Sequence, residues 1–268
     1  MKPYQTKRCV KGASSWLTLL PIADEGYELN KELFWDLIRI RYGYQLKRLP
    51  TLCECGSPFD LQHALSCKKG GFVSLRHNEL RNTIALMLKT ICKDVVIEPA
   101  LHPLTGEDLH EVSAITGDEA RLDIHARGFW QTGQSAFLDI RVFNPLAKRH
   151  VSQDLKKCFD SNEREKKRAY NQRVLEIEHG SFTPLVFSAT GGMGRECTKF
   201  ISRLAEMMAS KQDKPYSEVI TWMRQKLSIG LCKAVGICLR GSRSVFCKKD
   251  LNINEDISTS LLTTNIKI

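Results

Sequence analysis

The chain is expected to fold as an α/β protein in which helices flank a mixed β-sheet. Segments with helical periodicity and short β-rich runs follow one another in the order helix, three strands, helix, strand, helix. The composition is that of a globular protein, with 42% hydrophobic and 26% charged residues among 268. A chain of this length can bury one sizeable core, or a core domain together with a small accessory module.

The first part of the chain is expected to contain a helical lead-in followed by a small knuckle. Residues 1–50 form the lead-in, because apolar residues recur with loose helical spacing over 33–42 before Pro50 interrupts the pattern. Residues 51–71 are short and rich in cysteine. A segment of this kind has almost no apolar core of its own and needs another source of folding energy.

A larger α/β domain is expected over residues 72–210. It begins with apolar residues at three- and four-residue steps, which predict an amphipathic helix of about six turns. Three β-rich runs bounded by turn signals follow, and then come a second helix, a fourth strand, a glycine-rich turn and a last helix. The first helix is expected over 72–92 and the three strands over 95–99, 121–126 and 136–143. The second helix is expected over 154–178, the fourth strand over 182–188, the glycine-rich turn over 191–194 and the last helix over 196–210.

The C-terminal part is expected to be helical and then loose. Residues 211–249 are rich in lysine and arginine, and they include one or two apolar helices over 216–239. Residues 250–268 are polar and lack capping signals. We therefore expect 211–249 to form basic helices and 250–268 to form a loose tail.

Neither a membrane span nor a secretory signal is expected. Charged residues interrupt every apolar stretch well before the roughly 20 residues that a span requires. Residues 1–8 lack the apolar core of a secretory signal. The chain is therefore expected in the nucleus or elsewhere inside the cell, where its 10 cysteines are thiols or metal ligands rather than disulfides.

Positive charge is concentrated in two parts of the chain. The formal net charge is +10 and the isoelectric point is about 9.1. Lysine and arginine gather in 141–173 and again in 211–249. A basic surface attracts polyanions and releases their counterions, so a nucleic acid is the expected partner. A merely soluble basic protein is the alternative, and charge alone separates the two poorly.

Four potential metal ligands lie within the knuckle, namely Cys53, Cys55, His63 and Cys67. Three cysteines and one histidine in so short a segment are typical of tetrahedral zinc sites. Gly56 can adopt the positive φ that turns backbone amides toward the thiolates, and His63 and Cys67 are one helical turn apart. The spacing predicts a structural zinc site without an open position, whereas the alternative is three chance cysteines and a surface histidine.

Two expected strands each carry one carboxylate, Asp123 and Asp139. Period-two alternation puts Asp139 and Arg141 on one face of their strand, and it puts Asp123 opposite Leu122 and Ile124. Two carboxylates on one sheet face repel each other unless a cation lies between them. A divalent cation there can lower the pKa of a water molecule and offset the charge of a phosphodiester during hydrolysis. Lys166 interrupts the apolar stripe of the helix over 154–178, where a lysine is costly unless it serves a site.

Each of these residues also has a purely structural interpretation. Lys166 can extend along an apolar surface to solvent. Asp139 can pair with Arg141, and Asp123 can cap a turn. Taken together, however, the two carboxylates and the lysine favour a metal-dependent site.

The charged and polar residues of the expected α/β domain occur in an order that resembles the PD-(D/E)XK nuclease pattern. The order is Arg76-His77-Asn78, Arg121-Leu122-Asp123, Phe137-Leu138-Asp139-Ile140, and Glu163 with Lys166 and Tyr170. With a CCHC finger directly before it, residues 51–210 resemble the C-terminal endonuclease module of site-specific non-LTR retrotransposons. The resemblance implies a restriction-endonuclease-like fold and Mg²⁺-dependent cleavage of DNA.

Roles for individual residues follow from this resemblance. It implies that Asp123 and Asp139 hold Mg²⁺. It also implies that the active lysine has moved from the strand to the helix as Lys166, and that Arg141 occupies the strand position where the lysine usually lies. Glu79 is the candidate for an additional acidic residue, while Glu163 and Tyr170 are expected to support the lysine or the scissile phosphate. The candidate DNA contacts are Arg76, His77, Arg141, Lys167, Arg168 and Arg173.

Two other functions remain open at this point. The chain can be an inactive nucleic-acid-binding protein with the same fold, or an interaction protein whose finger and terminal helices recruit partners. The sequence also leaves open whether the chain acts as a homodimer, and whether one or both DNA strands are cut.

Overall fold

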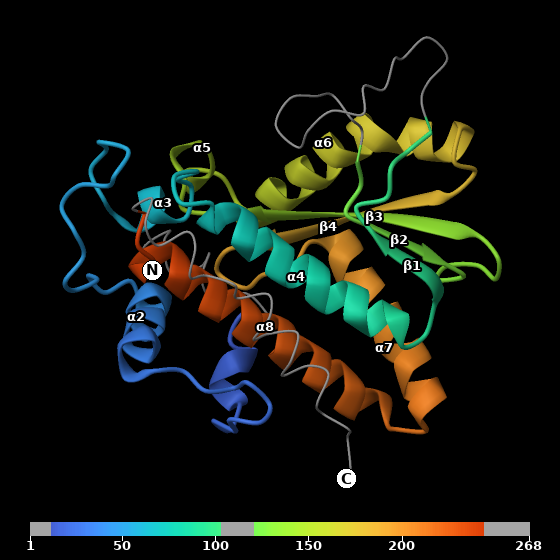
Figure 1. Ribbon diagram of the computed structural model, residues 1–268, viewed down its shortest axis with the longest axis horizontal. Helices are drawn as coiled ribbons and strands as arrows, with labels where there is room; N and C mark the ends of the chain where they lie inside the picture. The colour runs from blue at the N-terminus through green and yellow to red at the C-terminus, as the bar shows by residue number, and fades with distance from the viewer. Residues whose placement is uncertain (1–11, 103–120, 244–268) are drawn as a thin grey trace.

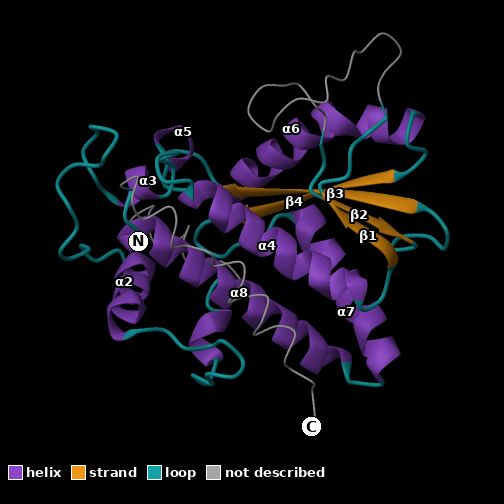
Figure 2. Ribbon diagram, in the orientation of Figure 1, coloured by secondary structure: helices purple, strands orange, loops and turns teal. Residues whose placement is uncertain are grey.

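The computed structural model describes residues 12–102 and 121–243, and there it shows a four-stranded mixed sheet flanked by helices (Figure 1, Figure 2). The strands lie in sequence order: β1 (Lys93–Ile97), β2 (Ile124–Arg127), β3 (Ser135–Phe143) and β4 (Ser181–Ser188). The first three are antiparallel, and β4 runs parallel to β3. The mixed α/β class predicted from the sequence is therefore confirmed.

The longer helices occur where apolar periodicity predicted them, but that periodicity did not predict the three four-residue helices of the described chain. The helices are η1 (Ser15–Thr18), α2 (Lys31–Tyr42), α3 (Leu61–Ala64), α4 (Phe72–Lys89), α5 (Lys148–Val151), α6 (Leu155–Glu176), α7 (Arg195–Gln212) and α8 (Tyr216–Arg240). The segment expected to contain one or two apolar helices forms the single helix α8. The end of the expected basic segment and the whole of the 250–268 tail lie outside the described residues.

Side-chain alternation in β3 assigns helices to the two faces of the sheet. Phe137 packs in one apolar cluster with Val174 of α6, and Phe143 packs in another with Phe159 of the same helix. The alternate residues Leu138 and Ile140 point into the main core, to which α4, α7 and α8 contribute. Helix α6 therefore covers one face, α4 and α7 cover the other, and α8 packs outside those two helices.

The main core extends beyond the α/β domain. It includes Trp16 of η1, Phe59 of the knuckle and Leu231 of α8, together with residues of α4, α7 and the sheet. The lead-in, the knuckle and the C-terminal helix thus bury apolar surface against the same core. Burial of this shared surface stabilises all of these segments together.

A buried ion pair joins the two ends of the described chain. The carboxylate of Asp36 in α2 is 1% exposed, and it accepts hydrogen bonds of 2.7 and 2.8 Å from Arg240 at the end of α8. The same guanidinium donates to the carbonyl oxygens of Lys47 and Arg48, at 2.8 and 2.9 Å. Arg240 therefore fixes both α2 and the chain that follows it.

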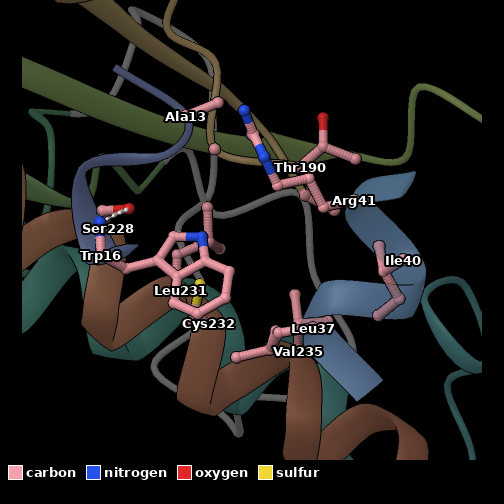
Figure 3. Close-up of a pocket in the computed structure, with 12 residues that line it drawn as sticks. Ala13, Trp16, Leu37, Ile40, Arg41, Thr190, Ser228, Leu231, Cys232 and Val235 are labelled. Atoms are coloured by element: carbon pink, nitrogen blue, oxygen red, sulfur yellow. Dashed lines mark hydrogen bonds between the residues drawn. The ribbon is translucent and has the colours of Figure 1, made fainter. Parts of the chain in front are cut away.

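The glycine-rich run after β4 forms the expected tight turn into α7. Gly191 has a φ of +97°, and a Cβ atom there would lie 2.9 Å from the Cα of Ala13. Beside this turn is a small cavity of about 40 Å³, lined by apolar residues that include Trp16, Leu37 and Leu231 (Figure 3). A cavity of this size holds a few water molecules and is far too small for a substrate.

Candidate functional site

The structure brings the four predicted ligands of the knuckle together. The ligand atoms of Cys53, Cys55, His63 and Cys67 all lie within 4.8 Å of one another. The sulfur atom of Cys67 is 3.8 Å from that of Cys53 and 3.9 Å from that of Cys55, and the Cys55 sulfur is 3.3 Å from His63 Nε2. A tetrahedral ion with metal–sulfur bonds of about 2.3 Å separates two sulfur ligands by about 3.8 Å. The Cys3His cluster can therefore bind a metal such as zinc.

Local backbone hydrogen bonds arrange these ligands. The Cys53 amide donates to Ser57 O at 2.9 Å, and Gly56, with a φ of +82°, donates back to Cys53 O at 2.8 Å. On the other side, the Cys67 amide donates to His63 O at 2.8 Å. A tight turn thus presents the first two cysteines, and one helical turn presents the other two ligands, as their spacing predicted.

The electrostatics of the knuckle differ between its cysteines. Hydrogen bonds from the side chain and backbone of Ser57 lower the pKa of Cys55 to about 6, whereas burial raises the pKa of Cys53. The thiolate is the form that binds metal. The lowered pKa of Cys55 favours its thiolate, whereas the raised pKa of Cys53 favours its neutral thiol until a metal is bound.

Asp139 lies near the middle of β3 on the face covered by α6, and it is 5% exposed. The Nζ atom of Lys166 is 3.1 Å from Asp139 Oδ1 and 2.9 Å from Oδ2. The ammonium thus pairs with both carboxylate oxygens, and the buried Oδ2 atom has no further hydrogen-bond partner among the described residues. Lys166 therefore extends from α6 toward the sheet, and not along the surface to solvent.

Asp123 lies one residue before β2 and not inside a strand. Its Oδ1 atom is 2.9 Å from Nε2 of His77, and its Oδ2 atom accepts a hydrogen bond from the backbone amide of Ile140. Backbone pairing of β2 with β3 ends at this point, and the carboxylate satisfies the next amide of β3. The expected alternation fails here, because Leu122 packs on the α6 side and Ile124 packs in the main core.

Asp123 with His77 and Asp139 with Lys166 form two adjacent pairs, because the Asp123 carboxylate accepts from the amide of Ile140, the residue after Asp139; we call these four residues the carboxylate site. His77 approaches from α4 and Lys166 from α6, so opposite faces of the sheet both contribute. Burial raises the pKa of Asp139 to about 6, and the negative charge of Asp123 acts in the same direction against the opposing charge of Lys166. A buried carboxyl group of raised pKa beside a second carboxylate is a frequent feature of functional sites.

Tyr170 is also close to this group. The Lys166 ammonium lies 5.4 Å from the centroid of the Tyr170 ring, which packs on Phe182 at 5.7 Å. The ring therefore restricts the lysine side chain from the side of α6.

Glu79 is not part of the carboxylate site. It lies two residues after His77 on α4, which turns it toward α8. A Cβ atom on Gly230 would lie 3.0 Å from Glu79 Oε1, so a glycine in α8 allows this approach. Burial raises the pKa of Glu79, and the charges of Lys233 and Lys226 oppose that rise. The expectation of an additional acidic residue at the site is therefore wrong for Glu79.

Arg76 is not available to DNA. It is 1% exposed, because it belongs to the α4 stripe that also contains Phe72 and Leu80 and that α8 covers. Desolvation lowers the pKa of this guanidinium, which lies beside Cys238. The expected DNA contact is therefore wrong for Arg76. Arg76 lies four residues after Phe72, so helical spacing places it on the buried side of α4.

Glu163 has a structural contact away from the carboxylate site. It is 7% exposed, and its Oε1 atom accepts a 3.0 Å hydrogen bond from the Glu196 amide in the first turn of α7. A carboxylate at this position satisfies a free helix amide and interacts favourably with the helix dipole. Glu163 therefore caps α7, and the expected support of Lys166 is not observed.

This assignment predicts different effects for two glutamates of α6, Glu163 in its first half and Glu176 at its end. Replacement of Glu163 by Ala should destabilise the fold by about 1–2 kcal/mol, because it removes a cap from α7. Replacement of the exposed Glu176 by Ala should leave stability within about 0.5 kcal/mol of the unmodified chain. Urea denaturation measures both, and equal midpoints for the two variants would contradict the capping role.

The remaining candidate DNA contacts lie on or beside α6. Arg141 pairs with Glu165 at 2.8 Å, and Arg173 donates to His102 O at 2.7 Å. Lys167 is 3.3 Å from Glu196, and Arg168 is exposed. The side chains of Arg141 and Arg173 are therefore engaged within the protein, whereas Lys167 and Arg168 face the surface. His77, the last of the predicted contacts, binds Asp123 instead.

An open groove of about 940 Å³ runs between α6 and the start of α7. Basic residues along it are Lys156, Arg164, Lys167 and Arg195, and acidic residues are Asp160, Glu163 and Glu196. It is the larger of the two hollows described in this part of the chain. The groove therefore carries both positive and negative charge, and most of its basic side chains belong to α6.

No protein-family model matches the chain, and a search of curated proteins finds no significant similarity. Among the helices of residues 12–102 and 121–243, none combines the length and the apolar character that crossing a membrane requires. The case for a function therefore depends on the geometry of the two sites.

Proposed function

We propose that this chain is a metal-dependent DNA endonuclease with a restriction-endonuclease-like fold, derived from a retrotransposon, and that zinc binds its knuckle. The observation that carries this proposal is the convergence of Asp123, Asp139 and Lys166, which lie far apart in the sequence, with His77 as a fourth member. The absence of a similar family leaves this geometry as the main support.

The residues present fit a divalent cation. Asp139 Oδ2 is buried with the Lys166 ammonium 2.9 Å away and no other partner among the described residues, and the Asp123 carboxylate is near enough to act on the pKa of Asp139. Oxygen ligands of this kind are what Mg²⁺ prefers, usually with one or two carboxylates from the protein. When bound, Mg²⁺ supplies a Lewis acid that lowers the pKa of water and offsets charge on the phosphate. Asp123 and Asp139 are the residues that would hold it.

The other side chains of the site would hold the carboxylates in position and balance their charge. Lys166 neutralises Asp139 in the protein alone, and its ammonium can orient a water molecule or stabilise negative charge on the phosphodiester. His77 and the Ile140 amide hold the Asp123 carboxylate from two directions. A carboxylate held in this way loses little further freedom when it binds a cation.

DNA is the proposed substrate because of the charge around the site. The chain carries a net charge of +10, and α6, which provides Lys166, also exposes Lys156, Lys157 and Arg168. Such side chains bind phosphates without reading bases. They would hold the sugar-phosphate backbone along α6 while the carboxylate site acts on one linkage.

The test is nicking of supercoiled plasmid by the purified chain. We expect cleavage in Mg²⁺, none in EDTA, and loss of cleavage in Asp139→Asn, because the amide removes the charge that binds the cation. Binding of a labelled duplex in EDTA should persist in this variant. If the duplex binds but no Mg²⁺-dependent cutting occurs, the chain is a nucleic-acid-binding protein without this activity; if the duplex does not bind at low salt, the nucleic-acid proposal fails as a whole.

A further inference from the structure

Two tyrosines after α2 form an exposed aromatic pair. Tyr42, the last residue of the helix, is 53% exposed, and Tyr44 is 66% exposed. Their ring centroids are 6.2 Å apart, and the ring planes are inclined by 31°. Aromatic side chains are usually buried in the core, so a neighbouring exposed pair is unusual.

The backbone holds this pair in place. Gly43, with a φ of +76°, ends α2 in the left-handed conformation, and the Tyr44 amide donates to Arg39 O at 2.9 Å. The chain that follows is bound by Arg240, which donates to the carbonyl oxygens of Lys47 and Arg48. The rings therefore project from a backbone that is fixed on both sides, so little conformational entropy is lost when a ligand stacks on them.

Basic side chains surround the tyrosines. Residues 39–48 include Arg39, Arg41, Lys47 and Arg48 and no acidic residue. Lys47 is exposed, and the Arg48 side chain is 88% exposed, with only a loose 3.9 Å contact to the exposed Glu32. Because Arg240 contacts the backbone of these two residues, their side chains are not needed for that contact.

We propose that Tyr42 and Tyr44, with Lys47 and Arg48, form a binding site for single-stranded nucleic acid. Unpaired bases would stack on the exposed rings, beside the Arg41 guanidinium that lies 5.9 Å from the Tyr42 centroid, and the side chains of Lys47 and Arg48 would contact the phosphates. Exposed aromatic rings in a positively charged surface are the arrangement with which proteins hold single strands without reading sequence. A duplex offers no free base faces except at its ends, so it would not use the rings.

This site is separate from the carboxylate site. Figure 1 places α2 and the chain after it at one end of the long axis, and strands β1 and β2 toward the other. The inference goes beyond the proposed nuclease activity and does not depend on it, because binding can be measured in EDTA. If both are correct, the tyrosines would hold an unpaired strand at a distance from the bond that is cut.

The test measures binding of labelled dT20 and rU20 single strands, and of a 20-base-pair duplex, by fluorescence anisotropy in EDTA at low salt. We expect Tyr42→Ala/Tyr44→Ala to weaken single-strand binding at least roughly tenfold, and to change duplex binding little. Tyr42→Phe/Tyr44→Phe keeps the rings and should bind as the unmodified chain does. Tyr216→Ala removes an exposed tyrosine at the start of α8 and should have no effect.

The basic residues give a second readout. Replacement of Lys47 and Arg48 by Ala should reduce the slope of log affinity against log salt by roughly 0.7 for each charge removed. The proposal is overturned if neither single strand binds, if the double alanine variant binds single strands as tightly as the unmodified chain, or if it loses duplex binding to the same extent. Each of these results is independent of whether plasmid is cut.

Discussion

Replacement of Lys166 by Met is expected to slow plasmid nicking in Mg²⁺ by roughly a hundredfold to ten-thousandfold. The proposed role requires a positive charge or an exchangeable proton at Nζ, which is 2.9 and 3.1 Å from the two oxygens of Asp139. Methionine keeps much of the length and apolar contact of the lysine stem but has neither. Initial rates of conversion of supercoiled to nicked plasmid measure the effect.

Cation binding separates a catalytic role of Lys166 from a structural one. Its ammonium competes with a divalent cation for Asp139, so Lys166→Met should bind Mn²⁺ at least as tightly as the unmodified chain in calorimetric titration. Lys89→Met, an exposed change in the last turn of α4, is the matched control and should cut normally. Cutting by Lys166→Met at the unmodified rate would contradict the role, and loss of both cation binding and fold would show that the lysine is structural.

The Cys67→Ser variant is expected to lose its metal and much of its stability. Structural zinc supplies on the order of 10 kcal/mol to isolated zinc fingers. Phe59 and Leu65 of the knuckle belong to the main core, so loss of the metal should also loosen the packing around α4 and α8. We expect a fall in Tm of roughly 10 °C or more, given about 2–4 °C for each kcal/mol in a domain of this size.

Metal analysis and thermal melting together test this prediction. The unmodified chain should contain one zinc ion per molecule, and Cys67→Ser should contain none. Cys92→Ser, which changes a partly buried cysteine outside the cluster, should keep the zinc and most of the Tm. The prediction fails if the unmodified chain purifies without zinc, or if Cys67→Ser and Cys92→Ser melt at the same temperature.

The features that could be predicted are those that residues close together in the sequence determine. The four ligands of the knuckle lie between Cys53 and Cys67, so a turn and one helical turn are enough to bring them together. The order of helices and strands follows from apolar spacing in the same way. Period-two alternation correctly placed Asp139 on one face of β3, and helical spacing correctly turned Lys166 toward the sheet.

Other features required the packing of distant segments. His77 and Asp123 are 46 residues apart, and no local pattern connects them. Their contact exists because β2 begins at Ile124, three residues later than expected, which leaves the Asp123 carboxylate outside the strand, where it meets both His77 of α4 and the Ile140 amide. The left-handed turn at Gly43 and the long-range contacts of Arg240 position the exposed tyrosines, although the aromatic and basic residues themselves are visible in the sequence.

By itself, the sequence determined the class of fold, the element order, the metal-ligand cluster and the faces of β3 and α6. Only the tertiary structure decided what covers each face, since periodicity says which residues share a side and not which segment lies against that side. Helix α8 packs on α4, so Arg76, which looked like a site residue, is buried, and Glu79 is half-buried against α8. The start of α7 lies beside α6, so Glu163 of α6 caps α7, whereas Lys166 of α6 contacts Asp139.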